Sequence, residues 1–245
     1  MNLNSQLPMN KLLTSLLLAL ALAGATQPAA HAYSSSVDNL FVIIPDDDAN
    51  GYQNSQPVSG VGGSVQHVSV TLNLSGGFNG DLYAYLFHNN TSAILLNRAG
   101  RSNTSGVGCP DAGFGPDAGA NSFTFNDQAS HDVHLYRSFA YTLNSSGQLT
   151  GQWQPDGRAI DPSSAQALFD SAPRASPLGV FNGMDPNGLW TLYLADVSPG
   201  NESALLGWGL IIEVPEPGSA ILICFGLAGG LSWAWPRCRA RSKQG

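Results

Sequence analysis

Residues 187–212 read NGLWTLYLADVSPGNESALLGWGLII, and this stretch decides the fold. The apolar residues of its two halves each occupy alternate positions: Trp190, Leu192 and Leu194, then Trp208, Leu210 and Ile212. Successive side chains of a β-strand point to opposite faces, so this alternation predicts two half-buried strands. The Ser-Pro-Gly-Asn run at 198–201 separates them and is typical of a tight turn.

The same alternation recurs upstream in three further segments: Val68, Val70, Leu72 and Leu74; Leu82, Ala84 and Leu86; and Phe123 with Phe125. Glycine-, asparagine- and aspartate-rich turns separate these segments. Many short strands with such turns predict an all-β protein, a jelly-roll-like antiparallel β-sandwich. One short helix is expected over 163–171, with Asp161 as its cap and Pro162 at its first position.

Several short motifs of this domain occur in one order along the chain. They are Asn79-Gly80-Asp81-Leu82, Phe125-Asn126-Asp127, Gly151-x-Trp153-x-Pro155, Asn187-Gly188-x-Trp190-Thr191-Leu192, Asp196 and Leu205-x-x-Trp208-x-Leu210. Over about 41–213 this series resembles the P domain (P/Homo B domain) of subtilisin-like proprotein convertases. The resemblance implies a jelly-roll sandwich that supports the folding of a protease domain. The chain departs from the family in having only a signal peptide before this domain, and in extra segments at 112–120 and 154–175.

The first 32 residues have the features of a secretory signal peptide. Lys11 precedes the apolar run 12–23, and Ala30-His31-Ala32 forms an A-x-A cleavage site, with 23–25 as a second candidate. The run is too short to span a bilayer comfortably and lacks a polar face. We therefore expect export, cleavage by signal peptidase, and a mature domain over 33–213.

The last 32 residues, 214–245, resemble the PEP-CTERM sorting signal of Gram-negative bacteria. Its expected parts are a motif, Val214-Pro215-Glu216-Pro217, a transmembrane helix over about 219–235, and a basic stop signal of Arg237, Arg239, Arg241 and Lys243 within 237–243. The resemblance implies cleavage by exosortase near the motif. The alternative is an ordinary single-pass tail anchor. In either case we expect the protein to be anchored in the inner membrane. If the tail is a sorting signal, we expect the processed protein at the cell surface or in the extracellular matrix.

The domain between these ends is strongly acidic. Residues 33–214 carry five arginines and no lysine against sixteen aspartates and glutamates, a formal charge of −11. Such a domain does not bind a polyanion by counterion release, so nucleic acid is not expected as a partner. Cys109 is its single cysteine, which rules out a disulfide within the domain.

No catalytic constellation is visible, so the domain is not expected to be an enzyme. His131-Asp132-Val133-His134 is the nearest approach to a metal site, but no third ligand follows at a diagnostic spacing, and a solvated loop is the simpler interpretation. His67 and His88 are expected at the surface. Calcium is the candidate cofactor at Asp46, Asp47 and Asp48, because carboxylates suit hard cations, although three exposed acids at the end of a strand are the simpler interpretation. Four acids of the motifs are expected to cap turns: Asp81, Asp127, Asp185 and Asp196.

The sequence therefore predicts an exported surface or matrix protein with a non-catalytic binding module. Two kinds of partner stay open, a polysaccharide and a protease. Trp153 and the face of Tyr83 and Tyr85 are candidates for an aromatic binding platform, unless a second sheet packs over them. The rival function is an accessory or regulatory P domain that acts with a separate subtilisin-like serine protease.

Overall fold

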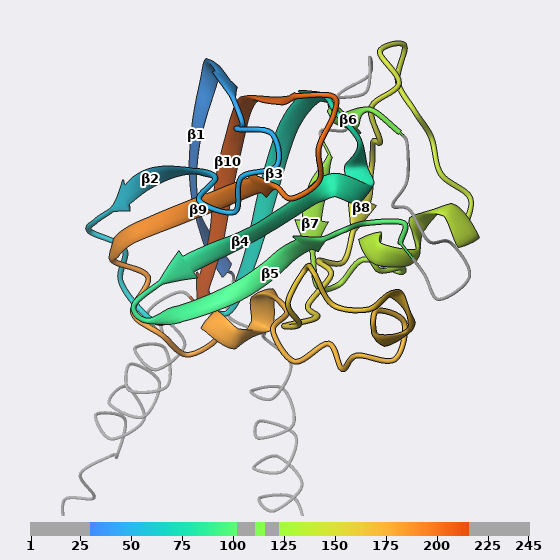
Figure 1. Cartoon of the computed structure of the whole chain (residues 1–245). Coiled ribbons are helices and arrows are strands. Elements are labelled where there is room, and N and C mark those ends of the chain that lie inside the picture. The colour runs from blue at the N-terminus through green and yellow to red at the C-terminus, as the bar shows by residue number, and fades with distance from the viewer. Residues whose placement is uncertain (1–29, 102–110, 116–122, 216–245) are drawn as a thin grey trace, which may run out of the picture. The chain divides into compact units, whose positions relative to one another are not determined.

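The alternating segments form two packed β-sheets, as the sequence predicts (Figure 1). A computed structural model describes residues 30–101, 111–115 and 123–215 of the protein. Within these ranges ten strands are present, and Ala30–Pro215 is one compact unit. The expected antiparallel β-sandwich is therefore confirmed.

The larger sheet has the strand order β1-β10-β3-β7-β8, and β6 also pairs with β3. Its neighbours are antiparallel apart from the short parallel pair β7–β8. Its strands are β1 (Ala30–Ile43), β3 (His67–Gly76), β6 (Gly113–Phe114), β7 (Thr124–Asn126), β8 (Gln152–Trp153) and β10 (Ser203–Pro215).

The smaller sheet has the order β2-β9-β4-β5 and is antiparallel throughout. Its strands are β2 (Tyr52–Val58), β4 (Leu82–His88), β5 (Thr91–Asn97) and β9 (Gly188–Asp196). β9 is a central strand here, whereas β10 is central in the larger sheet. The stretch 187–212 thus supplies one inner strand to each layer.

The core lies between the inner faces of the two sheets. All of the apolar residues that alternate in the sequence are buried there, and Trp190 and Trp208 are among the largest of them. The indole nitrogen of Trp190 donates to the carbonyl of Pro186, and that of Trp208 donates to Oδ1 of Asn54. Because each indole N–H has a partner, these rings add their apolar area to the core without an unsatisfied donor.

The helix expected over 163–171 is wrong. The segment contains only the 3-10 turn η3 (Gln166–Leu168), and Asp161 holds a local turn by accepting from N and Oγ of Ser163. Phe169 is fully buried while Leu168 is half exposed, so the segment is anchored at one point rather than along an apolar stripe. The other 3-10 turns are η1 (Asn79–Asp81), η2 (Val133–Ser138) and η4 (Leu178–Phe181).

The two ends of the described unit lie side by side. Ala30 pairs with Pro215, Ala32 pairs with Glu213, and Tyr33 pairs with Ile212. The expected signal-peptidase site therefore falls within β1, and Val214 and Pro215 fall within β10. Glu216, Pro217, the segment 219–235 and the basic residues 237–243 lie outside the described residues. Within those that are described, no helix has both the length and the apolar character needed to cross a bilayer.

Candidate functional site

The structure separates the two histidines that were considered as a metal pair. His131 is exposed, and its ring stacks on Phe139 with centroids 3.8 Å apart. His134 is fully buried, and its Nδ1 lies 2.7 Å from Oδ2 of Asp156. The expected solvated loop is therefore wrong for His134, whose partner lies 22 residues downstream. Among the described residues, no group of three or more histidines, cysteines and acids is arranged to hold a metal.

His88 is a second correction, because it is buried rather than exposed. Its ring stacks on Trp190 at 4.0 Å, and its nitrogens lie 3.0 Å and 2.8 Å from the carbonyls of Leu189 and Asp185. The neighbouring Asn89 and Asn90 are exposed and form the turn that the sequence indicates. His88 itself belongs to β4, and the inward parity of that strand accounts for its burial.

The acids considered for calcium serve different turns. The carboxylate of Asp46 accepts from the backbone N–H of Gly200 at 2.9–3.0 Å. Oδ1 of Asp48 accepts from the backbone and side-chain nitrogens of Asn50, both at 2.8 Å. Asp47 is exposed, with a φ of 51°. These contacts are those of turn-capping residues, and calcium binding stays a prediction.

Three of the four motif acids cap turns as expected. Asp127 accepts from N–H groups at the start of η4, Asp185 from Asn187, and Asp196 from Ser198. Asp81 instead makes a 3.5 Å ion pair with Arg98. These contacts leave the motif acids with local structural roles.

The outer face of the smaller sheet carries a cluster of three tyrosines. Tyr83 and Tyr85 lie on β4, and Tyr193 lies opposite Tyr85 on β9. The rings of Tyr85 and Tyr193 stack with centroids 4.5 Å apart, and Tyr83 meets both edge-on at 6.1–6.3 Å. Among the described residues no second sheet packs over this face, because the larger sheet covers the opposite side of β4 and β9 (Figure 1). A loop borders it, since Tyr193 is 8% exposed and its hydroxyl donates to the carbonyl of Ala49. Trp153, the other candidate for a platform, is 5% exposed and belongs to the core.

A hollow of about 510 Å³ opens beside these rings. We call it the tyrosine hollow; it is lined by Tyr83 and Tyr193, by Ser92 and Ile94 of β5, and by residues 159–162. Its size falls in the ordinary range of small-molecule sites. Its lining combines aromatic rings, a hydroxyl and an acid, which suits a ligand that has both apolar and polar faces.

One wall of the tyrosine hollow belongs to the extra segment 154–175. The backbone N–H groups of Asp156 and Gly157 donate to the carbonyls of Leu95 and Ile94. Farther along, Nδ2 of Asn97 donates to the carbonyls of residues 158 and 160, at 3.0 Å and 2.9 Å. The segment therefore lies along β5 and bonds to its backbone without forming a further strand of the smaller sheet.

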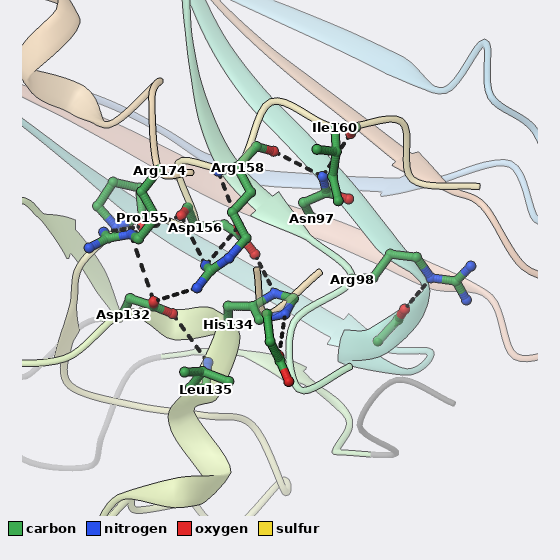
Figure 2. A network of polar contacts seen from close by, with 12 residues as sticks. Asn97, Arg98, Asp132, His134, Leu135, Pro155, Asp156, Arg158, Ile160 and Arg174 are labelled. Carbon is green, nitrogen blue, oxygen red and sulfur yellow. Dashed lines mark hydrogen bonds and ion pairs between the residues drawn. The ribbon is translucent and has the colours of Figure 1, made fainter. Parts of the chain in front are cut away.

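Five ionisable side chains, of which His134, Asp156 and Arg158 are buried, hold this wall in place (Figure 2). We call them the charged network: Asp132, His134, Asp156, Arg158 and Arg174. The guanidinium of Arg158 lies 3.2 Å from Oδ1 of Asp156 and 3.1 Å from Oδ2 of Asp132. Asp156 thus has His134 on one carboxylate oxygen and Arg158 on the other.

Arg174 ties the far end of the segment back to its start. Its guanidinium donates to Oε1 of Gln154 at 2.6 Å and to the carbonyls of Pro155 and Asp156 at 2.8 Å and 3.0 Å. Residues 154–174 are thereby closed into a loop with both ends bonded together. Such contacts position a backbone; they do not leave a reactive group exposed.

Electrostatics support this structural role. Burial lowers the pKa of Arg158, but the nearby carboxylates of Asp156 and Asp132 outweigh it and raise that pKa overall. The pKa values of Tyr83 and Tyr193 are raised, first by burial and then by neighbouring tyrosines and acids. Both phenols therefore stay neutral hydrogen-bond donors near pH 7.

Sequence reasoning missed Tyr193 and the wall of the hollow. The signal for Tyr193 was present, since it occupies the opposite parity to Trp190, Leu192 and Leu194. The wall carries no such signal, because its residues form no regular element. The partners of His134 and Arg158 likewise lie in irregular segments.

Comparisons with known proteins identify no family for this chain. No family model and no curated protein matches it. Two solved structures align with 81% of it: a complex of the Aeromonas sobria serine protease with its chaperone, at 15% identity and a TM-score of 0.43, and the serine protease of Aeromonas sobria, at 14% and 0.41. The aligned parts span 29% and 30% of those chains. Both TM-scores are below 0.5, so nothing is concluded about this chain from either similarity.

Proposed function

We propose that this chain is an exported, non-catalytic β-sandwich module that holds a polysaccharide at its tyrosine hollow. The observation that carries the proposal is the cluster of Tyr83, Tyr85 and Tyr193 on the outer face of the smaller sheet, where Tyr193 is 8% exposed, beside a hollow of about 510 Å³. Tyrosine joins an apolar ring to a polar hydroxyl, and sugars present both C–H faces and hydroxyl groups. The lining therefore matches a sugar ring better than a purely apolar ligand.

A binding role without catalysis is supported by where the reactive groups lie. His134 and Asp156 form the pair most similar to the acid and base of a hydrolase, and both are fully buried. A general base must reach the proton that it removes, either directly or through one water. Their burial and their contacts with the wall favour a structural role.

Export and surface display form the second part of the proposal. They rest on the signal peptide at 1–32 and on the tail at 214–245, for which signal peptidase and exosortase are the proposed processing enzymes. The strand pairing is compatible with cleavage at both ends. The β1–β10 ladder continues from the Tyr33–Ile212 pair inward, so most of it survives removal of either end.

Retention on polysaccharide tests the binding role. Full-length protein is mixed with insoluble polysaccharide from the envelope of the producing cell, and the bound fraction is measured after sedimentation. Tyr83→Leu should lower retention about tenfold, because it removes a ring face worth roughly 1 kcal/mol or more and leaves the apolar bulk. Ser55→Ala is the matched control, since Ser55 is exposed on β2 of the same sheet and only contacts Thr191. Equal retention of Tyr83→Leu and wild type would reject the tyrosine hollow as the binding site.

A second candidate function is an accessory domain for a separate subtilisin-like serine protease. The order of motifs from Asn79 to Leu210, which resembles that of P domains, favours it. Co-purification tests this role. A protease from the same cell that recovers activity only when this chain is present would support it, and failure to find such a protease would leave polysaccharide binding as the single proposal.

A further inference from the structure

The charge around the tyrosine hollow narrows the choice of ligand. Among the ten residues that line the hollow, Asp161 carries the only formal charge. Asp48 lies next to the lining residue Ala49, and its carboxylate contributes to the raised pKa of Tyr193. Neither lysine nor arginine is part of the lining. The nearest cation is that of Arg101, whose guanidinium donates to the carbonyl of Pro162 at 3.5 Å. The side chains that line the hollow themselves carry one negative charge and no positive charge.

Asp161 is held in a fixed position with one oxygen in use. Its Oδ1 accepts from the backbone N–H of Ser163 at 2.8 Å and from its hydroxyl at 2.6 Å. These bonds lower the pKa of Asp161, so the carboxylate is ionised at neutral pH. Both bonds are accepted by Oδ1, and Asp161 is exposed, so Oδ2 can accept from a ligand.

The rings add to the attraction for positive charge. The face of a tyrosine ring attracts a cation through its quadrupole, and this attraction grows when the cation is partly desolvated. Tyr83 lines the hollow together with Asp161, and the carboxylate of Asp161 contributes to the raised pKa of Tyr83. A group that offers a positive charge and an apolar surface would use both features at once.

We propose that the polysaccharide bound in the tyrosine hollow carries protonated amines, as a chain of unacetylated amino sugars does. This inference rests on the proposed function and specifies its substrate class. The sugar ring packs against Tyr83, and the ammonium group is bound by the Asp161 carboxylate. Glycans with carboxylate or phosphate groups are disfavoured, because Asp161 and Asp48 repel them.

The test compares two oligosaccharides that differ only at the nitrogen. Isothermal titration of the full-length protein with a β-1,4-linked glucosamine hexamer and with its fully N-acetylated counterpart measures the two dissociation constants. At low salt, and at a mildly acidic pH at which the amines are protonated, the amine form should bind about tenfold more tightly, because only it carries the positive charge. In about 1 M salt this preference should fall to about twofold or less, since exposed charges are then screened.

Two substitutions test the contributions of the Asp161 charge and of the Tyr83 ring to binding separately. Asp161→Asn keeps the oxygen that accepts from Ser163, so the turn is preserved while the charge is lost. It should remove most of the preference for the amine form, measured as the ratio of the two dissociation constants. Tyr83→Leu should weaken binding of both hexamers, and Ser55→Ala should change neither.

The outcomes distinguish this inference from the function on which it rests. Equal or tighter binding of the N-acetylated hexamer would overturn the amine specificity and leave polysaccharide binding in place. Tighter binding of an oligogalacturonate than of the glucosamine hexamer would also overturn it. If neither hexamer binds, the amine inference is overturned, and retention on envelope polysaccharide still decides the proposed function.

Discussion

Two groups of buried acids in this protein have opposite electrostatic surroundings. In the charged network, Asp156 lies 3.2 Å from Arg158 and 2.7 Å from His134. The second group, which we call the acid pair, is Asp81 and Asp196. The guanidinium of Arg98 lies 3.5 Å from Asp81 and attracts Asp196 only weakly. Oδ2 of Asp196 is buried and has no hydrogen-bond partner within the described residues.

The difference shows that two equally buried aspartates can have quite different partners. Asp156 and Asp196 are both fully buried. Burial raises the pKa of Asp196 from 3.8 to about 6, and the carboxylates of Asp81 and Asp46 add to this effect. Burial likewise raises the pKa of Asp81, against the lowering effect of Arg98. The charged network thus has cationic partners that stabilise the wall. In the acid pair, by contrast, burial opposes ionisation at neutral pH.

The largest effect is expected from breaking the charged network. Asp156→Ala should reduce the free energy of unfolding by about 3–5 kcal/mol at pH 7, because Arg158 and His134 then lose their shared buried partner. Urea denaturation of the full-length chain measures the change. Asp161→Asn, at an exposed acid on the same segment, is the control and should leave the free energy of unfolding close to that of the wild type. A loss below about 1 kcal/mol for Asp156→Ala would show that the network does not hold the fold.

The stability that the acid pair contributes should fall as the pH rises, whereas the contribution of a carboxylate with a cationic partner rises. Because the pKa of Asp196 is raised in the folded state, its contribution is fully present below about pH 4 and is lost as the pH rises through about 6. The loss amounts to at most about 2–3 kcal/mol. Asp196→Asn keeps the acceptor for Ser198 and should not show this loss. Its stability relative to wild type, measured with urea at pH 4, 5, 6 and 7, should therefore rise with pH; a flat difference would contradict the unpaired acid.

The smallest effect on stability is expected from substituting Arg98, the cation beside the acid pair. Arg98→Gln should cost about 1 kcal/mol at pH 7, since the ion pair with Asp81 is partly solvated and only 3.5 Å long. The cost should shrink at pH 4, where Asp196 is protonated. The difference between the costs at pH 7 and pH 4 separates the effect of the Arg98 charge from that of the hydrogen bond that Arg98 donates to the carbonyl of Gly80. An equal cost at both would mean that Arg98 acts through its hydrogen bonds alone.

The sequence by itself determined the two-sheet fold and its core. Alternation with period two is a local property of a strand, so it predicted which side chains of β3, β4, β9 and β10 point inward. The same parity placed Tyr83 and Tyr85 on the opposite face. His88 shows a limit of reading the neighbourhood alone, because its Asn-rich turn suggested exposure while its parity in β4 buried it.

Only the tertiary structure decided which segments border the tyrosine cluster. The segment 154–175 forms almost no regular structure, so no periodicity relates its residues to their partners. His134 meets Asp156, and Asn97 meets the carbonyl of Arg158, across intervals that depend on the path of irregular backbone. Charged contacts of this kind form where the folded chain brings them together, and composition and spacing therefore do not reveal them.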